Sequence, residues 1–210
     1  MTATGRRDAR VADDNYPTPA WCVHRLLDEL PWLRERQTYL EPCAGAGAIL
    51  RAFDTHRAAR LSPRRWIVVE KRAEELPALS SLVPLDNIAI GSILSPDVKR
   101  WVLERVLGSY VDVAITNPPF AIAQDVIDAC LSLAGYVAVL LRTNFLASEA
   151  RAEFMRKCPP DVYQLPNRPA FVNGKTDSTE YAWFVWGPQR SRLDGRVRVL
   201  APTPREERCR

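Results

Sequence analysis

Short apolar runs alternate with longer, helix-like stretches along most of this chain, and this alternation limits the fold more than any other feature. Strand-length apolar runs occur at residues 38–40, 66–69, 88–90, 111–115, 136–141 and 181–186. Helix-length stretches lie at about 47–59, 72–80, 95–107, 121–133 and 148–156, and Pro19 opens one more at 20–30. Because strands that alternate with helices build parallel sheets, the sequence predicts an α/β fold with helices on both faces of a mostly parallel sheet.

The last part of the chain departs from this alternation. The run at 181–186 follows the irregular stretch PNRPAFVNGKTDST rather than a helix, so it is expected to join the sheet as an antiparallel hairpin strand. No repeat, low-complexity block or Gly/Ser-rich linker divides the sequence. We therefore predict one domain at residues 15–187, between a flexible N-terminal segment at 1–14 and a basic C-terminal segment at 188–210.

Charge and cysteine content narrow the range of cellular roles. From Gln189 onward the chain has seven Arg against three acids, which accounts for the whole net charge of +4. Such a tail either attracts polyanions or is a solvated end. Five cysteines with no C-x-x-C pair argue against a disulfide framework or a metal site, and the polar N-terminus and short apolar runs indicate neither export nor a membrane anchor. A cytoplasmic protein is expected.

The loop EPCAGAG follows the first strand and contains Glu41 and the glycine pair Gly45 and Gly47. Glycines here let the backbone turn tightly and approach a ligand, although a two-glycine turn can also be a mere chain reversal. The second strand ends in Glu70, and an acid at this place suits the two hydroxyls of a ribose. Leu50 stands where a dinucleotide site needs a third glycine, so NAD is disfavoured. An acid in the loop suits an ammonium or sulfonium ligand, and S-adenosylmethionine carries both charges.

The stretch AITNPPFAI places two prolines directly behind a predicted strand. Proline cannot donate to a sheet, so the strand must end before Pro118, and Asn117 then lies at the carboxyl edge where open α/β sheets bind ligands. The Asn117 side-chain oxygen and the Pro118 carbonyl oxygen can each accept one hydrogen of an amino group, which directs the nitrogen lone pair toward an electrophile. Pro118 and Pro119 restrict the loop, and Phe120 offers a face to a base turned out of its stack. The alternative interpretation of NPPF is a plain turn between strand and helix.

These motifs resemble those of a known enzyme family. EPCAGAG, VVE and NPPF are spaced as in the amino-methyltransferases, which methylate exocyclic nitrogens with S-adenosylmethionine. NYPTP, LLRTNFL and RPAFVNGKTDSTEYAWFVW are similar to segments of the small phage and prophage adenine-N6 DNA methyltransferases, and the likeness covers about residues 15–187. The resemblance implies a Rossmann-like class I methyltransferase domain with a seven-stranded sheet. It also implies methyl transfer to adenine N6 in DNA after base flipping.

The resemblance further assigns residues to the site. Catalysis would fall to Asn117, Pro118, Pro119 and Phe120. The cofactor would be bound by Tyr16, Thr18, Pro19, Glu41, Pro42, Cys43, Ala44, Gly45, Gly47, Glu70, Lys71, Ser92, Ile93 and Asn117. The chain departs from the family at GSIL, where Ser92 stands in place of an Asp that bonds the cofactor adenine, and the shorter, uncharged hydroxyl should bind it more weakly. Ala46 also occupies a loop position that is often polar in relatives.

The sequence leaves other functions open. RNA enzymes also use NPPF, so the expected partner is a nucleic acid, DNA more than RNA, and a related Asn-Pro-Pro-Tyr motif serves in methylation of protein glutamine. A non-catalytic subunit that kept the fold is favoured by Ser92. No insertion supplies a target-recognition domain, so specificity should be short, relaxed or provided by a partner protein. The phosphate backbone is expected to meet residues 142–179, which include Arg151, Arg156, Lys157, Arg168 and Lys175.

Overall fold

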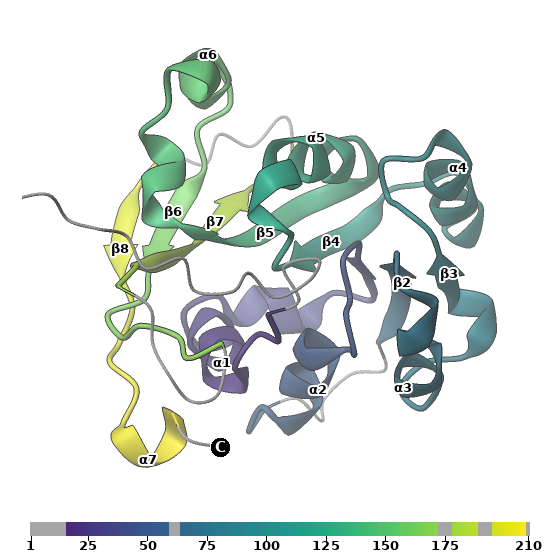
Figure 1. Cartoon of the computed structure of the whole chain (residues 1–210), viewed down its shortest axis with the longest axis horizontal. Coiled ribbons are helices and arrows are strands. Elements are labelled where there is room, and N and C mark those ends of the chain that lie inside the picture. Colours follow the sequence, from purple (N-terminus) through teal and green to yellow (C-terminus); the bar gives the residue numbers. More distant parts are fainter. Residues whose placement is uncertain (1–15, 59–63, 172–177, 189–194, 209–210) are drawn as a thin grey trace, which may run out of the picture.

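An eight-stranded sheet runs through the part of the chain that the computed structural model describes, residues 16–58, 64–171, 178–188 and 195–208 (Figure 1). Its strands are β1 (Thr38–Glu41), β2 (Arg65–Glu70), β3 (Ile88–Ile90), β4 (Val111–Thr116), β5 (Ala134–Arg142), β6 (Asp161–Gln164), β7 (Tyr181–Trp186) and β8 (Val197–Val199). They lie in the order β3-β2-β1-β4-β5-β7-β6-β8. The neighbours from β3 to β5 are parallel, and β7 is antiparallel to both β5 and β6.

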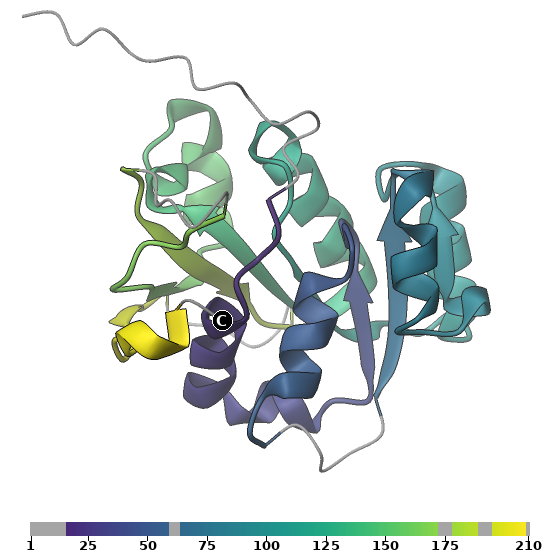
Figure 2. The ribbon, with the colours of Figure 1, turned by 60° about the horizontal axis from the view of Figure 1, so that its bottom comes forward.

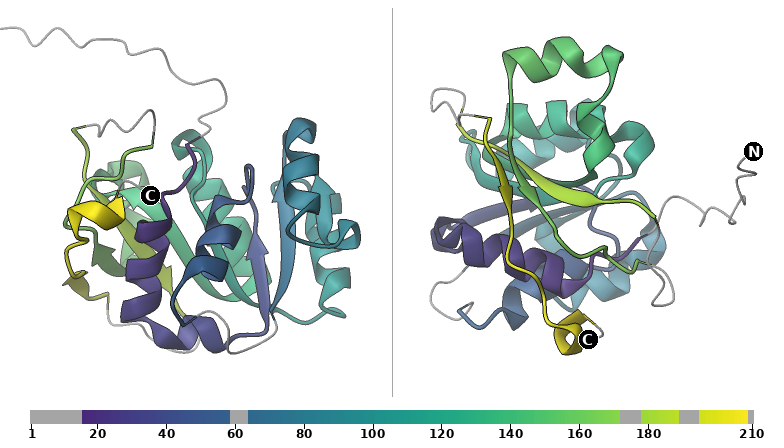
Figure 3. Two further views of the ribbon diagram at one scale, coloured as in Figure 1. Left: turned by 90° about the horizontal axis from the view of Figure 1, so that it is seen from below. Right: turned by 90° about the vertical axis from the view of Figure 1, so that its left-hand side faces the viewer.

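Helices cover both faces of this sheet (Figures 1 and 3). They are α1 (Ala20–Glu29), α2 (Ala48–Thr55) and α3 (Leu76–Ser80) on one face, and α4 (Pro96–Arg105), α5 (Ala123–Leu133) and α6 (Glu149–Lys157) on the other. Short 3-10 turns are η2 (Pro31–Glu35), η4 (Ala73–Glu75), η5 (Leu85–Asn87), η6 (Phe120–Ile122) and η7 (Thr143–Leu146). Within the described residues, no helix combines the length and apolar character that a membrane crossing requires.

Hydrophobic side chains fill both interfaces between the sheet and the helices. Successive residues of a strand point to opposite faces, so Trp183 of β7 packs with the side chains of α1 and α2, and Phe184 packs with those of α5. All residues of β7 are buried, as expected for a strand that is covered on both faces. The indole Nε1 of Trp183 donates a hydrogen bond of 2.9 Å to the carbonyl of Cys22 in α1. That bond satisfies a buried polar atom and holds α1 against the sheet.

The C-terminal segment returns to α1 and ends in the short helix α7 (Arg205–Arg208) (Figure 2). Arg25 of α1 donates to Glu207 at 2.8 Å and to the Thr203 hydroxyl at 2.9 Å. Before reaching α1, this segment contributes β8, which is parallel to β6. Residues 196–208 are therefore in contact with the sheet and with α1.

The α/β class, the helices on both faces and the antiparallel strand at 181–186 are confirmed. The predicted number of seven strands is wrong, because the described residues contain eight. The two strands without a sequence signal are β6 and β8. Val197 and Val199 of β8 are 67% and 72% exposed, so this strand is held by backbone pairing to β6 and leaves little trace in the apolar pattern.

Gly47 is the N-cap of α2 and has a φ of +83°. A Cβ added there would lie 2.5 Å from Leu82 Cδ1. We expect Gly47→Ala to lower the free energy of unfolding by about 1–3 kcal/mol through backbone strain, and by roughly 1 kcal/mol more through repacking of Leu82. Gly108→Ala is the matched control, because Gly108 has a φ of +77° and a Cβ added there would meet no atom within 4 Å outside its chain neighbours. Urea denaturation checks this, and equal losses in the two variants would mean that Leu82 yields without cost.

Candidate active site

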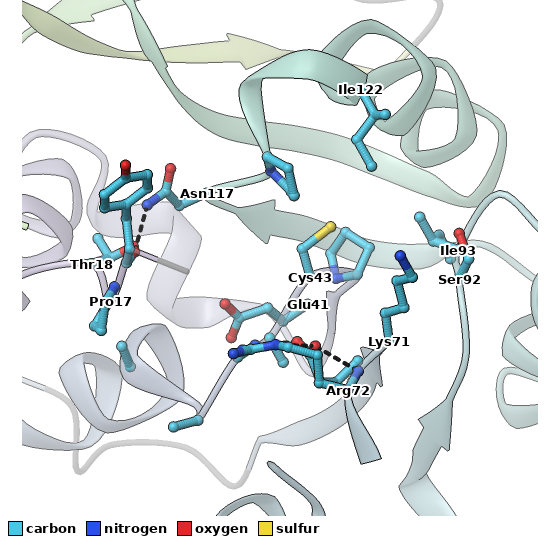
Figure 4. A pocket seen from close by; sticks show the side chains of 18 of the residues that line it. Pro17, Thr18, Glu41, Cys43, Lys71, Arg72, Ser92, Ile93, Asn117 and Ile122 are labelled. Carbon is cyan, nitrogen blue, oxygen red and sulfur yellow. Dashed lines mark hydrogen bonds and ion pairs between the residues drawn. The ribbon is translucent and has the colours of Figure 1, made fainter. Parts of the chain in front are cut away.

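A cavity of about 500 Å³ lies at the carboxyl ends of β1, β2, β3 and β4 (Figure 4). From β1 the chain continues through β2 to β3 on one side of the sheet, and it then crosses to β4 and β5 on the other side. The loops that follow β1 and β4 therefore lead in opposite directions. Open α/β sheets bind ligands at such a point. The volume is within the range of small-molecule sites. In Figure 4, Thr18 and Asn117 lie on one side of the cavity, and Lys71, Ser92 and Ile93 lie on the opposite side.

Glu41 is the last residue of β1 and lines the cavity while being only 2% exposed. Its Oε2 atom has no hydrogen-bond partner among the described residues. Burial, with a smaller contribution from the charge of Glu70, raises the pKa of Glu41 well above its usual range. A buried carboxyl without a partner is costly unless a ligand bonds to it. This arrangement can therefore receive a cationic ligand, whose charge would favour the ionised carboxylate.

Glu70 ends β2 and connects two walls of the cavity. Its Oε2 accepts the backbone N–H of Gly45 at 2.5 Å, and its Oε1 accepts the backbone N–H of Arg72 at 2.9 Å and Nε of Arg72 at 3.1 Å. Gly45 has a φ of +54°, a conformation that favours glycine. Glu70 thus holds the loop that follows β1, and the backbone of this loop lies at the cavity wall. Arg72 also pairs with Glu75 at 3.1 Å.

Asn117 follows the end of β4, as the prolines predicted. Its Nδ2 donates a hydrogen bond of 3.1 Å to the backbone carbonyl of Tyr16 (Figure 4). An amide nitrogen can only donate and an amide oxygen can only accept, so this bond fixes the two ends of the side chain. No described residue donates to Oδ1, which remains an acceptor. Pro119 lines the cavity close by, and the rigid pair Pro118 and Pro119 limits the freedom of this loop.

Phe120 faces a different environment. Its ring centroid is 6.0 Å from that of Tyr181, and the guanidinium carbon of Arg142 is 4.5 Å from the ring centroid. Phe120 begins the turn η6 and is partly buried against both hydrophobic clusters. Its ring is therefore directed toward β5 and β7.

The structure brings most of the predicted site residues together. Around the cavity lie Tyr16, Thr18, Glu41, Pro42, Cys43, Ala44, Gly45, Glu70, Lys71, Ser92, Ile93, Asn117 and Pro119. Pro19, Gly47, Pro118 and Phe120 are adjacent in the chain but are not among the lining residues. The Ser92 hydroxyl accepts the backbone N–H of Leu94 at 3.2 Å, which leaves its own proton available to a ligand.

Sequence reasoning did not assign several lining residues, namely Pro17, Ala46, Ala48, Arg72, Gly91, Ala121 and Ile122. Most of them are chain neighbours of predicted residues, so extending each motif by one or two positions would have found them. Arg72 is one of these neighbours, because it directly follows Lys71. Its side chain folds back onto Glu70, two positions earlier in the chain.

The sequence matches no protein-family model and no curated protein, whereas solved structures share its fold. A methyltransferase subunit of a type I restriction-modification system from Streptococcus thermophilus has a TM-score of 0.62 at 16% identity, over 88% of this chain and 47% of that chain. An RNA methyltransferase candidate from Pyrococcus horikoshii has a TM-score of 0.58 at 16% identity, over 88% and 93%.

A candidate class I S-adenosylmethionine-dependent methyltransferase from Listeria monocytogenes has a TM-score of 0.58 at 11% identity, over 86% of this chain and 62% of that chain. This chain thus spans less than two thirds of the Listeria and Streptococcus proteins. At such identities the likeness concerns the fold. The chain has the fold of the class I methyltransferases.

Proposed function

We propose that this protein transfers a methyl group from S-adenosylmethionine to the exocyclic N6 amino group of adenine in DNA. The observation that carries the proposal is the orientation of Asn117. Its nitrogen is bonded to Tyr16, and its oxygen remains an acceptor at the edge of a cavity that also contains Glu41 and Glu70. A site of this kind combines acceptors for an amino group with acids that suit a cationic nucleoside.

The residues of the cavity fit S-adenosylmethionine. The orphaned Oε2 of Glu41 would receive the charged end of the ligand, and the backbone turn at Gly45 would allow its close approach. Glu70 would bond the ribose hydroxyls with the lone pairs that Gly45 and Arg72 leave unused. Ser92 and Ile93 would hold the adenine from the opposite side. When bound, this cofactor supplies an electrophilic methyl group on a sulfonium sulfur.

The chain itself prepares the amino nitrogen of the substrate. The amino group of adenine is a poor nucleophile because its lone pair is delocalised into the ring. Asn117 Oδ1 and the Pro118 carbonyl oxygen would each accept one N–H, which draws the nitrogen toward tetrahedral geometry. They also stabilise the positive charge that develops on the nitrogen as it is methylated. Because these acceptors are held by Tyr16 and by the two prolines, little reorganisation is needed.

A duplex hides its bases, so the target adenine must leave the stack. Phe120 lies three residues beyond Asn117 but outside the cavity lining, so stacking on the extruded base would require the ring face that packs against Arg142 and Tyr181 to become accessible. Such stacking is worth about 1–3 kcal/mol per base, which is comparable to the cost of flipping. The restriction-modification subunit with this fold supports DNA as the substrate. Since this chain spans 47% of that subunit, a partner that supplies sequence specificity is part of the proposal.

Labelled methyl transfer to mixed DNA and RNA, with identification of the modified nucleoside after digestion, tests the proposal. We expect N6-methyladenine in DNA. The same base in RNA would reassign the nucleic acid, and label in protein glutamine would reassign the substrate class. Calorimetry without detectable S-adenosylmethionine binding at millimolar concentration would instead favour a non-catalytic subunit, the alternative that Ser92 supports.

A further inference from the structure

The chain contains two histidines, and the fold brings both of them to the junction of α1 and α2 (Figure 3). His24 belongs to α1, and His56 directly follows the last residue of α2. The centroids of their rings are 5.3 Å apart. His56 is only 4% exposed, and His24 is half-buried. Histidine is the side chain whose ordinary pKa makes it change charge between pH 5 and pH 8, so the two groups best suited to respond to this range face each other.

The hydrogen bonds of His56 require a neutral ring. The backbone N–H of Ala58 donates to Nδ1 at 3.2 Å, so Nδ1 is an acceptor. The ring proton therefore lies on Nε2, which donates to Asp28 of α1 at 3.1 Å. A second proton on Nδ1 would set two donors against each other at the Ala58 N–H. His56 can become charged only if this bond breaks.

His24 fastens the other half of the junction. Its Nε2 donates to the carbonyl oxygen of Ala52 at 2.9 Å and lies 3.2 Å from the Thr55 hydroxyl, so it ties α1 to the last turn of α2. Two charged rings at this separation would repel each other. Burial lowers the pKa of both imidazoles, and the hydrogen bonds to Asp28 and Ala52 offset only part of this effect.

Charged side chains around the two rings come from several elements. They are Arg25 and Asp28 of α1, Arg34 of η2, Arg57 and Glu207 of α7. Asp28 already accepts hydrogen bonds from Arg25 at 3.3 Å and from Arg57 at 3.0 Å, so two guanidinium groups share its charge. On α2 itself, Arg51 and Asp54 are engaged with other partners. Asp28 is thus neutralised without a charge on His56.

The two remaining charges act in opposite directions. The charge of Arg34 lowers the pKa of His56 further, whereas the charge of Glu207 raises the pKa of His24. Glu207 is itself paired with Arg25 at 2.8 Å, which weakens its effect on the ring. The surroundings therefore favour two neutral histidines while α1 and α2 are in contact.

We propose that His24 and His56 form an acid-sensitive clasp between α1 and α2, which is closed while both rings are neutral and opens when they take up protons. Both helices begin at the cavity, because Thr18 lies just before α1 and the loop with Gly45 lies before α2. Opening of the clasp would therefore loosen two walls of the cavity together.

The direction of the pH dependence follows from the two states. Open helices expose ordinary histidines, which bind protons that the closed pair excludes. The clasp is thus fully stable above about pH 6.5, and as pH falls below this value its opening constant rises by up to about tenfold per pH unit for each histidine.

NMR of the ring nitrogens and amide hydrogen exchange on the full chain test the clasp. Both wild-type rings should be Nε2–H tautomers at pH 8 and should titrate below 6.5. Arg100→His is the matched control, because it adds a histidine at an exposed site on α4 that should titrate near 6.5. From pH 8 to pH 5.5 the exchange protection of α1 and α2 should fall by about tenfold after correction for the intrinsic rates, while α5, on the other face of the sheet, keeps its protection.

His24→Gln and His56→Gln separate the clasp from ordinary acid unfolding. In urea denaturation the ratio of the unfolding constants of variant and wild type should fall by up to about tenfold between pH 6.5 and pH 5.5, and Arg100→His should run parallel to the wild type. Parallel curves for both glutamine variants, or wild-type rings that titrate at or above 6.5, overturn the clasp. Protection lost equally in α5 overturns the local opening. If a variant does not fold, the titration of the wild-type rings decides.

Discussion

Asn117→Ala is expected to reduce the rate of methyl transfer by about 10²–10³-fold, the loss typical of removing one preorganised group that stabilises developing charge. The reason is the fixed amide. The bond from Nδ2 to the Tyr16 carbonyl leaves Oδ1 as an acceptor, and alanine has no atom that replaces it. S-adenosylmethionine affinity should change little, because Glu41, Glu70 and the loop after β1 are untouched. Single-turnover kinetics and calorimetry on the same preparation measure the two effects separately.

The matched control for this variant is Asn87→Ala. Asn87 is partly buried and lies in η5, just before β3, at the end of the strands opposite to the cavity. It should transfer methyl groups at the wild-type rate. Wild-type turnover in Asn117→Ala would exclude Asn117 from the chemistry, whatever the product of the reaction is. Loss of both transfer and cofactor binding would mean instead that the Tyr16 contact mainly holds the cavity together.

The sequence predicted the elements whose evidence is local. Tyr136 to Leu141 and Tyr181 to Trp186 are dense apolar runs, and they became strands buried on both faces. The end of β4 was also predictable, since Pro118 and Pro119 cannot join a ladder. The strand ends then placed Glu41, Glu70 and Asn117 at one edge, because the strands between them are parallel.

Contacts between distant parts of the chain could not be predicted. The hydrogen bond from Asn117 to Tyr16 joins residues 101 positions apart, and no local pattern encodes it. The same is true of Arg142 over Phe120, which depends on the pairing of β5 with β7. β8 was missed for another reason. It lies in the basic segment at 188–210, where arginines are frequent, and its valines are mostly exposed, so no apolar run marks it as a strand.

Glu41→Gln is expected to have two opposite effects, a more stable ligand-free protein and a weaker cofactor complex. Burial raises the Glu41 pKa, so between the ordinary carboxyl pKa and the raised one the folded protein binds one more proton than the unfolded chain. Stability then falls as pH rises through this window, by about 1.4 kcal/mol per pH unit. Glutamine removes this dependence. The free energy of unfolding at neutral pH should therefore be higher in the variant than in the wild type.

Cofactor binding should instead favour the wild type, because a cationic ligand pairs with the ionised Glu41 carboxylate. Wild-type protein should release a proton when S-adenosylmethionine binds within this pH window, and Glu41→Gln should release none while binding at least about tenfold more weakly. Calorimetry in two buffers with different ionisation enthalpies gives the proton count, and Glu104→Gln, an exposed change on α4, should behave as the wild type. If Glu41 had only a structural role, Glu41→Gln would raise the stability of the protein without lowering its affinity for S-adenosylmethionine. If Glu41 binds the cation, Glu41→Gln must lose cofactor affinity and proton release together, since both depend on the same buried carboxylate.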